Sequence, residues 1–167
     1  MLMRIGFAIA TLTLLFAAPA QAQSPAPPPA LEYGAPISLD DAKKAAAAAI
    51  LECAKLGANP MAVAVVDPAG YLVHFERMDN TQYGSIRVAI DKARSAALYR
   101  RPSKVFEDAL ASGGIGLRVL TLHDAAPVEG GVPIMMGGKV VGAIGASGGA
   151  APQDGQVASA GVNAVKK

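Results

Sequence analysis

The residues of this sequence best suited to hold a metal ion are its two histidines, His74 and His123. His74 lies in an alternating stretch that predicts a strand, on one face with Leu72 and Met78, and an imidazole there could ligate iron. His123 is followed by Asp124, whose carboxylate could orient the ring for metal binding. Each position is also typical of an ordinary half-buried or loop histidine, and the spacing alone favours that plainer interpretation.

Nucleophilic catalysis has little support in the sequence. The stretch from Gly145 to Gly149 reads G-x-S-x-G around Ser147, but such a hydrolase needs a histidine after the serine, and both histidines precede it. Cys53, the one cysteine of the chain, lies on the apolar stripe of a predicted helix, where a thiol acts as a small hydrophobic group with a raised pKa. Motifs of phosphate loops, dinucleotide sites, zinc proteases and covalent haem attachment are absent from the sequence.

Composition excludes further classes of function. The 167 residues fit one domain, and 15 Lys and Arg against 13 Asp and Glu give a charge of +2 without a dense basic stretch. We therefore expect no nucleic-acid partner. A single cysteine also excludes an internal disulfide framework and a cysteine-rich zinc site.

The first residues are typical of an export signal. Arg4 precedes an apolar run from Ile5 to Ala18, and Ala20-Gln21-Ala22 provides an A-x-A cleavage site. We predict a Sec-type signal peptide over residues 1–22, cleaved after Ala22, and hence a periplasmic or secreted protein. The run is shorter than the roughly 20 residues of a spanning helix, so we expect no membrane span after cleavage. Residues 23–36 predict an extended proline-rich linker, and residues 37–167 the folded domain.

Hydrophobic periodicity predicts the elements that must position these side chains. Ser38 is a good N-cap for a first helix that ends near Gly57, and a later helix carries Arg87, Asp91 and Arg94 on one polar face. Asp67-Pro68-Ala69-Gly70 predicts a type I turn between two strands, and Gly137-Gly138 predicts a tight hairpin turn. The predicted strands are 61–66, 71–78, 117–122, 131–136 and 139–146, and the later helices are 85–99, 102–111 and 152–165.

This order of elements predicts the fold class. Hairpin-linked strands with helices grouped around them are typical of an α+β fold. We expect an antiparallel β-sheet of about five strands flanked by α-helices.

Six segments are more specific than any of these motifs. In chain order they are Val66–Val73 (VDPAGYLV), Arg77–Asp79 (RMD), Lys92–Ala93, Pro102–Ser103, Gly130–Ile134 (GGVPI) and Gly138–Gly149 (GKVVGAIGASGG). Together they resemble the GlcG/HbpS family of haem-binding proteins, over a span from Ser38 to about Val165. The resemblance implies an α+β domain with an antiparallel sheet that assembles into homo-oligomers. It also implies haem or tetrapyrrole binding in some members, haem sensing or degradation in a few, and links to glycolate-utilisation operons or cobalamin-related proteins in others.

The resemblance also implies a set of ligand-binding residues. We hypothesise that Arg77, Asp79 and Lys92 line a shared pocket, where Arg77 and Lys92 pair with haem propionates or a small carboxylate. The Arg77→Ala variant should then bind ligand more weakly while its melting temperature stays nearly unchanged. Many relatives carry an Asp-Glu pair after the Gly-rich strand, whereas this chain reads Gln153-Asp154-Gly155-Gln156, so a role of the second acid does not carry over. Among the matched residues, the candidates for ligand binding are Arg77, Met78, Asp79, Lys92, Gly131 and Pro133, with His74 and His123 as candidate iron ligands on chemical grounds.

These observations lead to one main hypothesis and its alternatives. The main one is an exported, non-enzymatic haem- or tetrapyrrole-binding homo-oligomer with an imidazole on the iron. The sequence leaves open a haem-degrading enzyme, an accessory protein that binds a small organic acid such as glycolate, and a purely structural oligomer.

Overall fold

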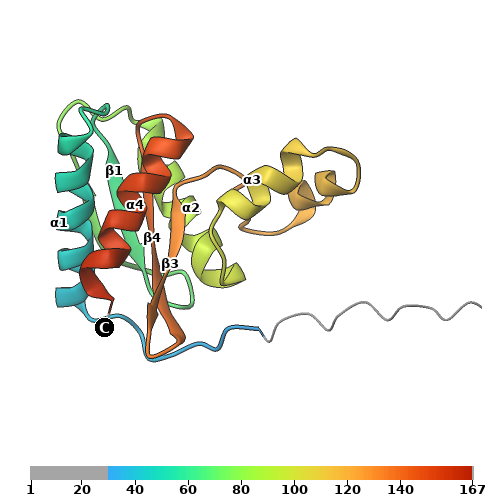
Figure 1. The fold of residues 1–167 in the computed structure, drawn as a ribbon, viewed down its shortest axis with the longest axis horizontal. Helices are drawn as coiled ribbons and strands as arrows, with labels where there is room; N and C mark the ends of the chain where they lie inside the picture. The colour runs from blue at the N-terminus through green and yellow to red at the C-terminus, as the bar shows by residue number, and fades with distance from the viewer. Residues whose placement is uncertain (1–29, 167) are drawn as a thin grey trace, which may run out of the picture.

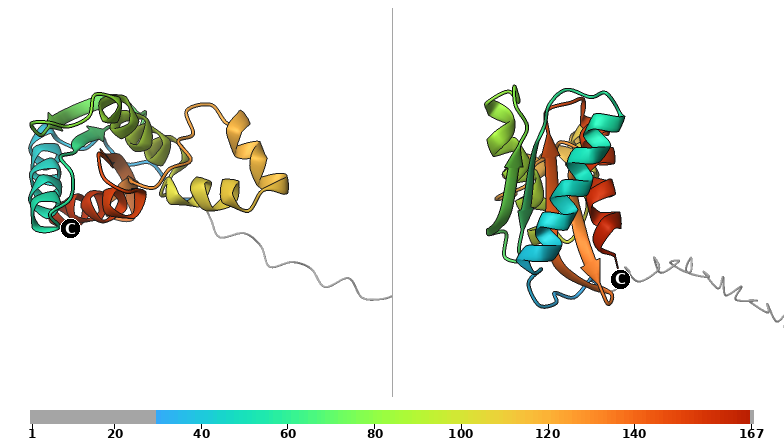
Figure 2. Two further views of the ribbon diagram at one scale, coloured as in Figure 1. Left: turned by 90° about the horizontal axis from the view of Figure 1, so that it is seen from above. Right: turned by 90° about the vertical axis from the view of Figure 1, so that its left-hand side faces the viewer.

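The computed structural model describes residues 30–166, so the predicted signal peptide and most of the predicted linker lie outside the described residues. One antiparallel sheet with strand order β2-β1-β4-β3 separates two helical layers (Figures 1 and 2). Helices α1 and α4 cover one face, and α2 covers the other. The elements are α1 (Leu39–Lys55), β1 (Ala62–Val66), β2 (Leu72–Arg77), α2 (Gly84–Tyr99), α3 (Lys104–Ala111), the 3-10 helix η1 (Gly114–Thr121), β3 (Gly131–Met136), β4 (Lys139–Ser147) and α4 (Ala151–Val165).

The predicted α+β class with an antiparallel sheet is confirmed, but the sheet has four strands instead of about five. The segment predicted as a strand over 117–122 lies mainly in η1. Gly113 and Gly114 both have positive φ, 65° and 53°, and they turn the chain back onto α3. Gly116 then lies so close to the Ala109 carbonyl that a side chain at position 116 would collide with it. This segment therefore turns back onto the preceding helix, with Val119 as its one buried side chain, and within residues 30–166 it pairs with no strand.

The local signals at the first helix and first turn are confirmed. The hydroxyl of Ser38 accepts a hydrogen bond of 3.1 Å from the Asp41 amide, which caps α1. In the turn between β1 and β2, one carboxylate oxygen of Asp67 accepts 2.9 Å hydrogen bonds from the amides of Ala69 and Tyr71. These short-range contacts fix the start of the sheet.

Helix α2 packs unusually close to the sheet because small residues line both surfaces. Alanines of α2 meet alanines of β1 and β4, and these side chains are fully buried. At Gly145 of β4, a Cβ atom would collide with the Ala89 carbonyl and lie 2.6 Å from the Ala93 amide nitrogen. The close approach fixes both the depth and the rotation of α2, and hence the direction of its outward polar face.

The end of the predicted linker packs against the domain. Glu32 and Gly34 exchange backbone hydrogen bonds of 2.8 Å with Val140 of β4. The hydroxyl of Tyr33, between them, donates to the Leu98 carbonyl at 2.8 Å, near the end of α2. This N-terminal strap thereby joins β4 to the carboxyl end of α2.

Residues 102–130, called the arm here, project from the sheet-and-helix body (Figures 1 and 2). The arm contains α3, η1 and the loop that returns to β3. Buried Ser103 anchors its base: the Ser103 hydroxyl donates to the Val128 carbonyl at 2.7 Å and accepts from the Gly131 amide at 2.9 Å. Within residues 30–166, no helix is long and apolar enough to cross a membrane.

The close packing of α2 predicts that substitution by alanine affects stability very differently at Gly145 and at Gly84. Gly145→Ala should lower the free energy of unfolding by about 1–3 kcal/mol or more, because the added methyl group forces α2 away from the sheet. Gly84, at the start of α2, faces open space, so Gly84→Ala should leave stability unchanged or raise it by up to about 1 kcal/mol. Urea unfolding of both variants tests this; equal stabilities would show that α2 moves at no cost.

Burial of Cys53 predicts an unreactive thiol. The side chain is fully buried, and burial, together with the charge of Asp154, raises the pKa of the thiol. Alkylation by iodoacetamide at pH 8 should be far slower in the folded protein than in denaturant. A native rate equal to that of the unfolded chain would contradict the buried position.

Candidate functional site

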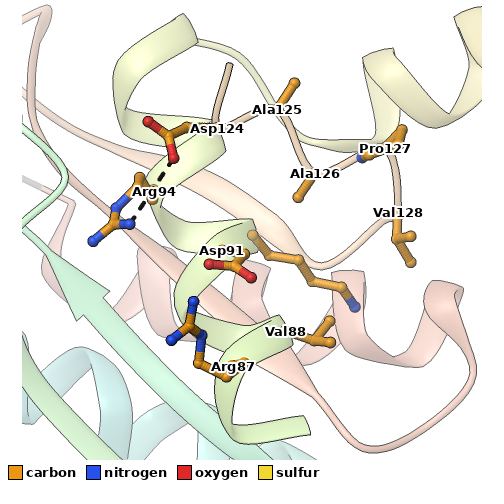
Figure 3. Close-up of a pocket in the computed structure, with 10 residues that line it drawn as sticks. Arg87, Val88, Asp91, Arg94, Asp124, Ala125, Ala126, Pro127 and Val128 are labelled. Carbon is orange, nitrogen blue, oxygen red and sulfur yellow. Dashed lines mark ion pairs between the residues drawn. The ribbon is translucent and has the colours of Figure 1, made fainter. Parts of the chain in front are cut away.

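A cleft of about 430 Å³ lies between α2 and the loop at the base of the arm (Figure 3). This volume falls within the range of small-molecule sites, about 300–1,000 Å³. The cleft is lined by Arg87, Val88, Asp91, Lys92, Arg94, Asp124, Ala125, Ala126, Pro127 and Val128.

The polar face of α2 forms the charged wall of the cleft. Arg87, Asp91 and Arg94 recur at helical spacing, and their side chains lie along one side of the opening (Figure 3). Arg94 forms an ion pair with Asp124 across the cleft at 4.0 Å, and its Nε atom donates to the Gly70 carbonyl at 3.3 Å. The charged wall thus combines two guanidinium groups with one carboxylate from α2.

The opposite wall is mostly apolar. Ala125, Ala126 and Pro127 run along it, and Val128 closes one end. This wall is held at both ends, because Ser103 binds the Val128 carbonyl and the Tyr99 hydroxyl donates to the His123 carbonyl at 2.6 Å. The loop is therefore fixed relative to α2 by contacts outside the cleft.

Lys92 contributes to the cleft, but its ammonium group is engaged inside the protein. The side chain is 1% exposed, and Nζ lies 2.7 Å from an Asp154 carboxylate oxygen and 3.2 Å from the Ala146 carbonyl oxygen. The other Asp154 oxygen accepts a 3.0 Å hydrogen bond from the Gly149 amide. The pair thus joins α2 to α4 and to the end of β4, and its charge is not free to bind an anionic ligand.

Burial also governs the protonation of this pair. Removal from water raises the pKa of the Asp154 carboxyl above its usual range, while the Lys92 ammonium and the Gly149 amide act in the opposite direction. The ionised carboxylate is tolerated in this place because Lys92 accompanies it.

Gly130 and Gly131, at the start of β3, make room for the buried pair. A Cβ atom at Gly130 would lie 2.8 Å from Lys92 Nζ, and one at Gly131 would collide with the Lys92 carbonyl. At Gly155, an added Cβ atom would collide with the carboxylate of Glu129. A carboxylate from the arm therefore lies directly beside α4.

The structure separates three of the matched residues, Arg77, Met78 and Asp79, from Lys92. The Arg77 guanidinium lies 5.9 Å from the centre of the Tyr83 ring, next to the start of α2, and Asp79 is exposed in the following turn. The sulfur of Met78 accepts a 3.4 Å hydrogen bond from the Met61 amide, and its side chain packs on the core. Lys92 lies nine residues beyond Tyr83, about 13 Å further along the helix axis.

Two further matched residues belong to β3, the strand at the edge of the sheet. Gly131 begins this strand against Lys92, and Pro133 is buried within it. A proline is accommodated there because an edge strand has one side without ladder hydrogen bonds.

The two histidines lie apart. His74 is opposite Val65 in the sheet register, on the face covered by α1 and α4, and its Nε2 atom lies 2.9 Å from Glu76. His123 follows η1 at the rim of the cleft; its side chain is 99% exposed, and Nδ1 lies 3.3 Å from Asp124. Among residues 30–166, no group of three or more His, Cys, Asp or Glu side chains is arranged to hold a metal ion.

The spacing of Arg87, Asp91 and Arg94 predicted the polar face of α2, but no motif marked Arg87 and Arg94 as part of a ligand site. The helical spacing of these two arginines was the one feature of the sequence that could have indicated their place in the cleft. The apolar wall at 125–128 carries no motif, and only the fold of the arm places it opposite α2.

Comparison with known proteins identifies the family. A family model described as haem degrading protein HbpS-like matches residues 37–163. The chain belongs to the HbpS-like family. The predicted resemblance to the GlcG/HbpS family is thereby confirmed.

Relatives of this HbpS-like chain agree with the assignment. Protein GlcG of Escherichia coli K12 is 35% identical over 87 residues, which cover 52% of this chain and 63% of GlcG. A crystal structure of a double mutant of HbpS from Streptomyces reticuli has a TM-score of 0.72 and 29% identity, covering 88% of this chain and 99% of that one. The structure of a PduOC complex with haem has a TM-score of 0.69 at 24% identity, covering 78% and 95%, and shows the same fold.

The buried pair of this HbpS-like domain predicts a large effect on stability. Lys92→Met should lower the free energy of unfolding by about 3–5 kcal/mol, because it leaves the Asp154 carboxyl buried without its opposite charge. The double variant Lys92→Met/Asp154→Leu should recover most of that loss, since it removes both charges. Urea unfolding followed by circular dichroism measures the change.

A matched ion pair on the surface provides the control. Lys104 and Asp108 also approach to 2.7 Å but are solvent-exposed, so Lys104→Met should leave stability nearly unchanged. A similar loss in Lys92→Met and Lys104→Met would contradict the role of burial.

Proposed function

We propose that this chain is an exported, non-enzymatic haem- or tetrapyrrole-binding protein whose ligand lies in the cleft between α2 and residues 124–128. The observation that carries the proposal is the pairing of two guanidinium groups, from Arg87 and Arg94, with a continuous apolar wall. The HbpS-like family and the haem complex of PduOC support this class of ligand.

The side chains of the cleft fit the chemistry of haem. Haem presents a flat apolar macrocycle and two propionate carboxylates. The wall from Ala125 to Val128 can pack against the macrocycle, and Arg87 and Arg94 can each form charge-assisted hydrogen bonds with a propionate. The two arginines are seven residues apart, which places their Cα atoms about 10 Å apart along α2.

His123 is the better placed of the two imidazoles. It precedes the cleft wall directly, and the Asp124 carboxylate beside Nδ1 favours the tautomer that leaves Nε2 free as a metal ligand. His74 lies on the opposite face of the sheet. Bound haem would supply an iron centre, while the role of the protein is to hold the propionates and shield the macrocycle from water.

A small organic acid is the second candidate ligand, because two guanidinium groups in an open cleft can also clamp a carboxylate such as glycolate. The apolar wall favours haem, since a small hydrophilic acid gains little from it.

Titration with haemin tests the ligand and the site together. The mature chain, residues 23–167, should give a saturable, shifted Soret band. The Arg87→Ala/Arg94→Ala double variant should bind about 100-fold more weakly or worse, since each charge-assisted hydrogen bond contributes about 1.5–3 kcal/mol and about 1.4 kcal/mol is a factor of ten in affinity. His123→Ala should alter the Soret position.

Two variants serve as matched controls: Arg77→Ala removes an arginine away from the cleft, and His74→Ala removes the other imidazole. Both should bind haemin like the wild type. For Arg77→Ala this replaces the expectation drawn from the resemblance, because the Arg77 guanidinium lies beside Tyr83 and does not line the cleft. Weaker binding by Arg77→Ala alone would show that the haem site lies at the end of β2 instead.

A featureless titration, combined with a rise in melting temperature with glycolate, would favour the organic acid as the ligand. Loss of the Soret band with reductant and O₂, with a defined bilin product, would indicate an enzyme instead.

Export is part of the same proposal and is supported by the signal-peptide pattern of residues 1–22. N-terminal sequencing of the protein recovered from the periplasm or medium should begin at Gln23. Recovery with the leader intact in the cytoplasm would contradict export.

A further inference from the structure

The charged wall of the cleft contains an acid that forms no ion pair with its neighbours. Asp91 lies between Arg87 and Arg94 on α2, as Figure 3 shows, and the residue is half-buried. Among residues 30–166, Asp91 has no ion-pair partner, although the two arginines lie three and four residues from it. Arg94 instead donates to the Gly70 carbonyl and approaches Asp124 at 4.0 Å. The carboxylate of Asp91 is therefore available to a ligand.

The charges of the cleft are already balanced before a ligand enters. The guanidinium groups of Arg87 and Arg94 face the carboxylates of Asp91 and Asp124, and the ammonium group of Lys92 is engaged by a buried carboxylate of α4. A ligand that brings two carboxylates to the arginines would place them beside Asp91 and create an excess of negative charge. Because like charges side by side oppose binding, a well-matched ligand also brings N–H donors or a nitrogen that takes up a proton.

The lining of the cleft does not provide ligands for iron. The protein ligands of haem iron are histidine, cysteine, methionine and tyrosine. Within residues 30–166, the ten residues that line the cleft include none of these four types. His123 lies at the rim, where its side chain is 99% exposed. Recognition inside the cleft therefore depends on charge and hydrogen bonding, and a ligand without a metal ion loses nothing there.

These observations specify the ligand of the proposed function, on which this inference rests. We propose that Asp91 is a specificity-determining residue, and that the cleft selects an open-chain tetrapyrrole over haem. Both kinds of molecule carry two propionates and a largely apolar body. The pyrrole nitrogens of haem are bound to iron, whereas an open-chain tetrapyrrole has N–H groups that can donate to a carboxylate. A carboxylate also stabilises the cation that forms when such a molecule takes up a proton.

The open chain matters as well as the absence of iron. Arg87 and Arg94 hold the propionates, as they would for haem, and the wall from Ala125 to Val128 packs against the pyrrole rings. In a cyclic porphyrin without a metal, the N–H groups point to the centre of the ring, where a side chain at its edge does not reach them. An open-chain molecule can turn an N–H group outward, toward Asp91.

Titration of the mature chain, residues 23–167, with biliverdin and with haemin tests the role of Asp91. The wild type should bind biliverdin at least about tenfold more tightly than haemin. Asp91→Ala should bind biliverdin about tenfold more weakly, because a hydrogen bond to a charged group is lost. The affinity of Asp91→Ala for haemin should stay the same or rise about two- to fivefold, because the variant removes a like charge beside the propionates.

An absorption signature separates recognition of the N–H groups from a general change in the cleft. The long-wavelength band of bound biliverdin should move to longer wavelength and strengthen, since the carboxylate stabilises the protonated chromophore. Asp91→Ala should lose this change, and Asp91→Glu, which keeps the charge, should retain part of it. Asp79→Ala is the matched control: Asp79 is an exposed acid that does not line the cleft, so this variant should titrate like the wild type. Circular dichroism checks that the variants are folded.

The outcomes separate this inference from the proposed function. Equal affinities of the wild type for biliverdin and haemin overturn the inference, as does an equal loss of both affinities in Asp91→Ala. Protoporphyrin IX carries the same propionates, and binding as tight as that of biliverdin would show that an open chain is not required. If haemin binds through Arg87 and Arg94 but biliverdin does not bind, the inference alone fails. If none of the three tetrapyrroles binds, the proposed function fails as well.

Discussion

The ion pair between Lys92 and Asp154 is the contact on which the arrangement of this domain depends. It lies inside the protein and joins α2, α4 and the end of β4, three segments far apart in the sequence. An ion pair removed from water contributes little net stability, but it strongly disfavours any arrangement that leaves one charge alone. With Lys92 directed inward, the helical period of 100° per residue turns Arg87, Asp91 and Arg94 outward, toward the cleft. The buried pair thus determines which side chains can meet a ligand.

Several residues that identify the family serve this scaffold. Gly130 and Gly131 admit the Lys92 side chain, Gly145 admits α2, and Ser103 holds the loop that leads into β3. Their roles explain why the family is recognisable from the sequence while its ligand is not. Arg87 and Arg94, which give the cleft its positive charge, lie outside the six segments by which the sequence resembles the family.

The parts of the structure that depend on neighbouring residues were predictable from the sequence. The Ser38 cap, the Asp67 turn and the Gly137-Gly138 hairpin are encoded within a few residues, and the elements that they join end close to the expected places. The prediction of a strand over 117–122 was wrong because the apolar pattern of this segment suits a strand and a short helix equally. Only its contacts with α3 decide between the two. The partner of Lys92 is 62 residues away, and no local pattern indicates such a contact.

The small residues between α2 and the sheet have a consequence for how such a domain can diverge. Positions such as Ala89, Ala93 and Gly145 accept no larger side chain without displacing the helix. The outward positions of α2 and the loop 124–128 are exposed or half-buried, so substitutions there meet less packing than at these positions. A scaffold of this kind can change its ligand while its fold stays the same. The close packing of α2 on the sheet thereby confines chemical variation to the residues that line the cleft.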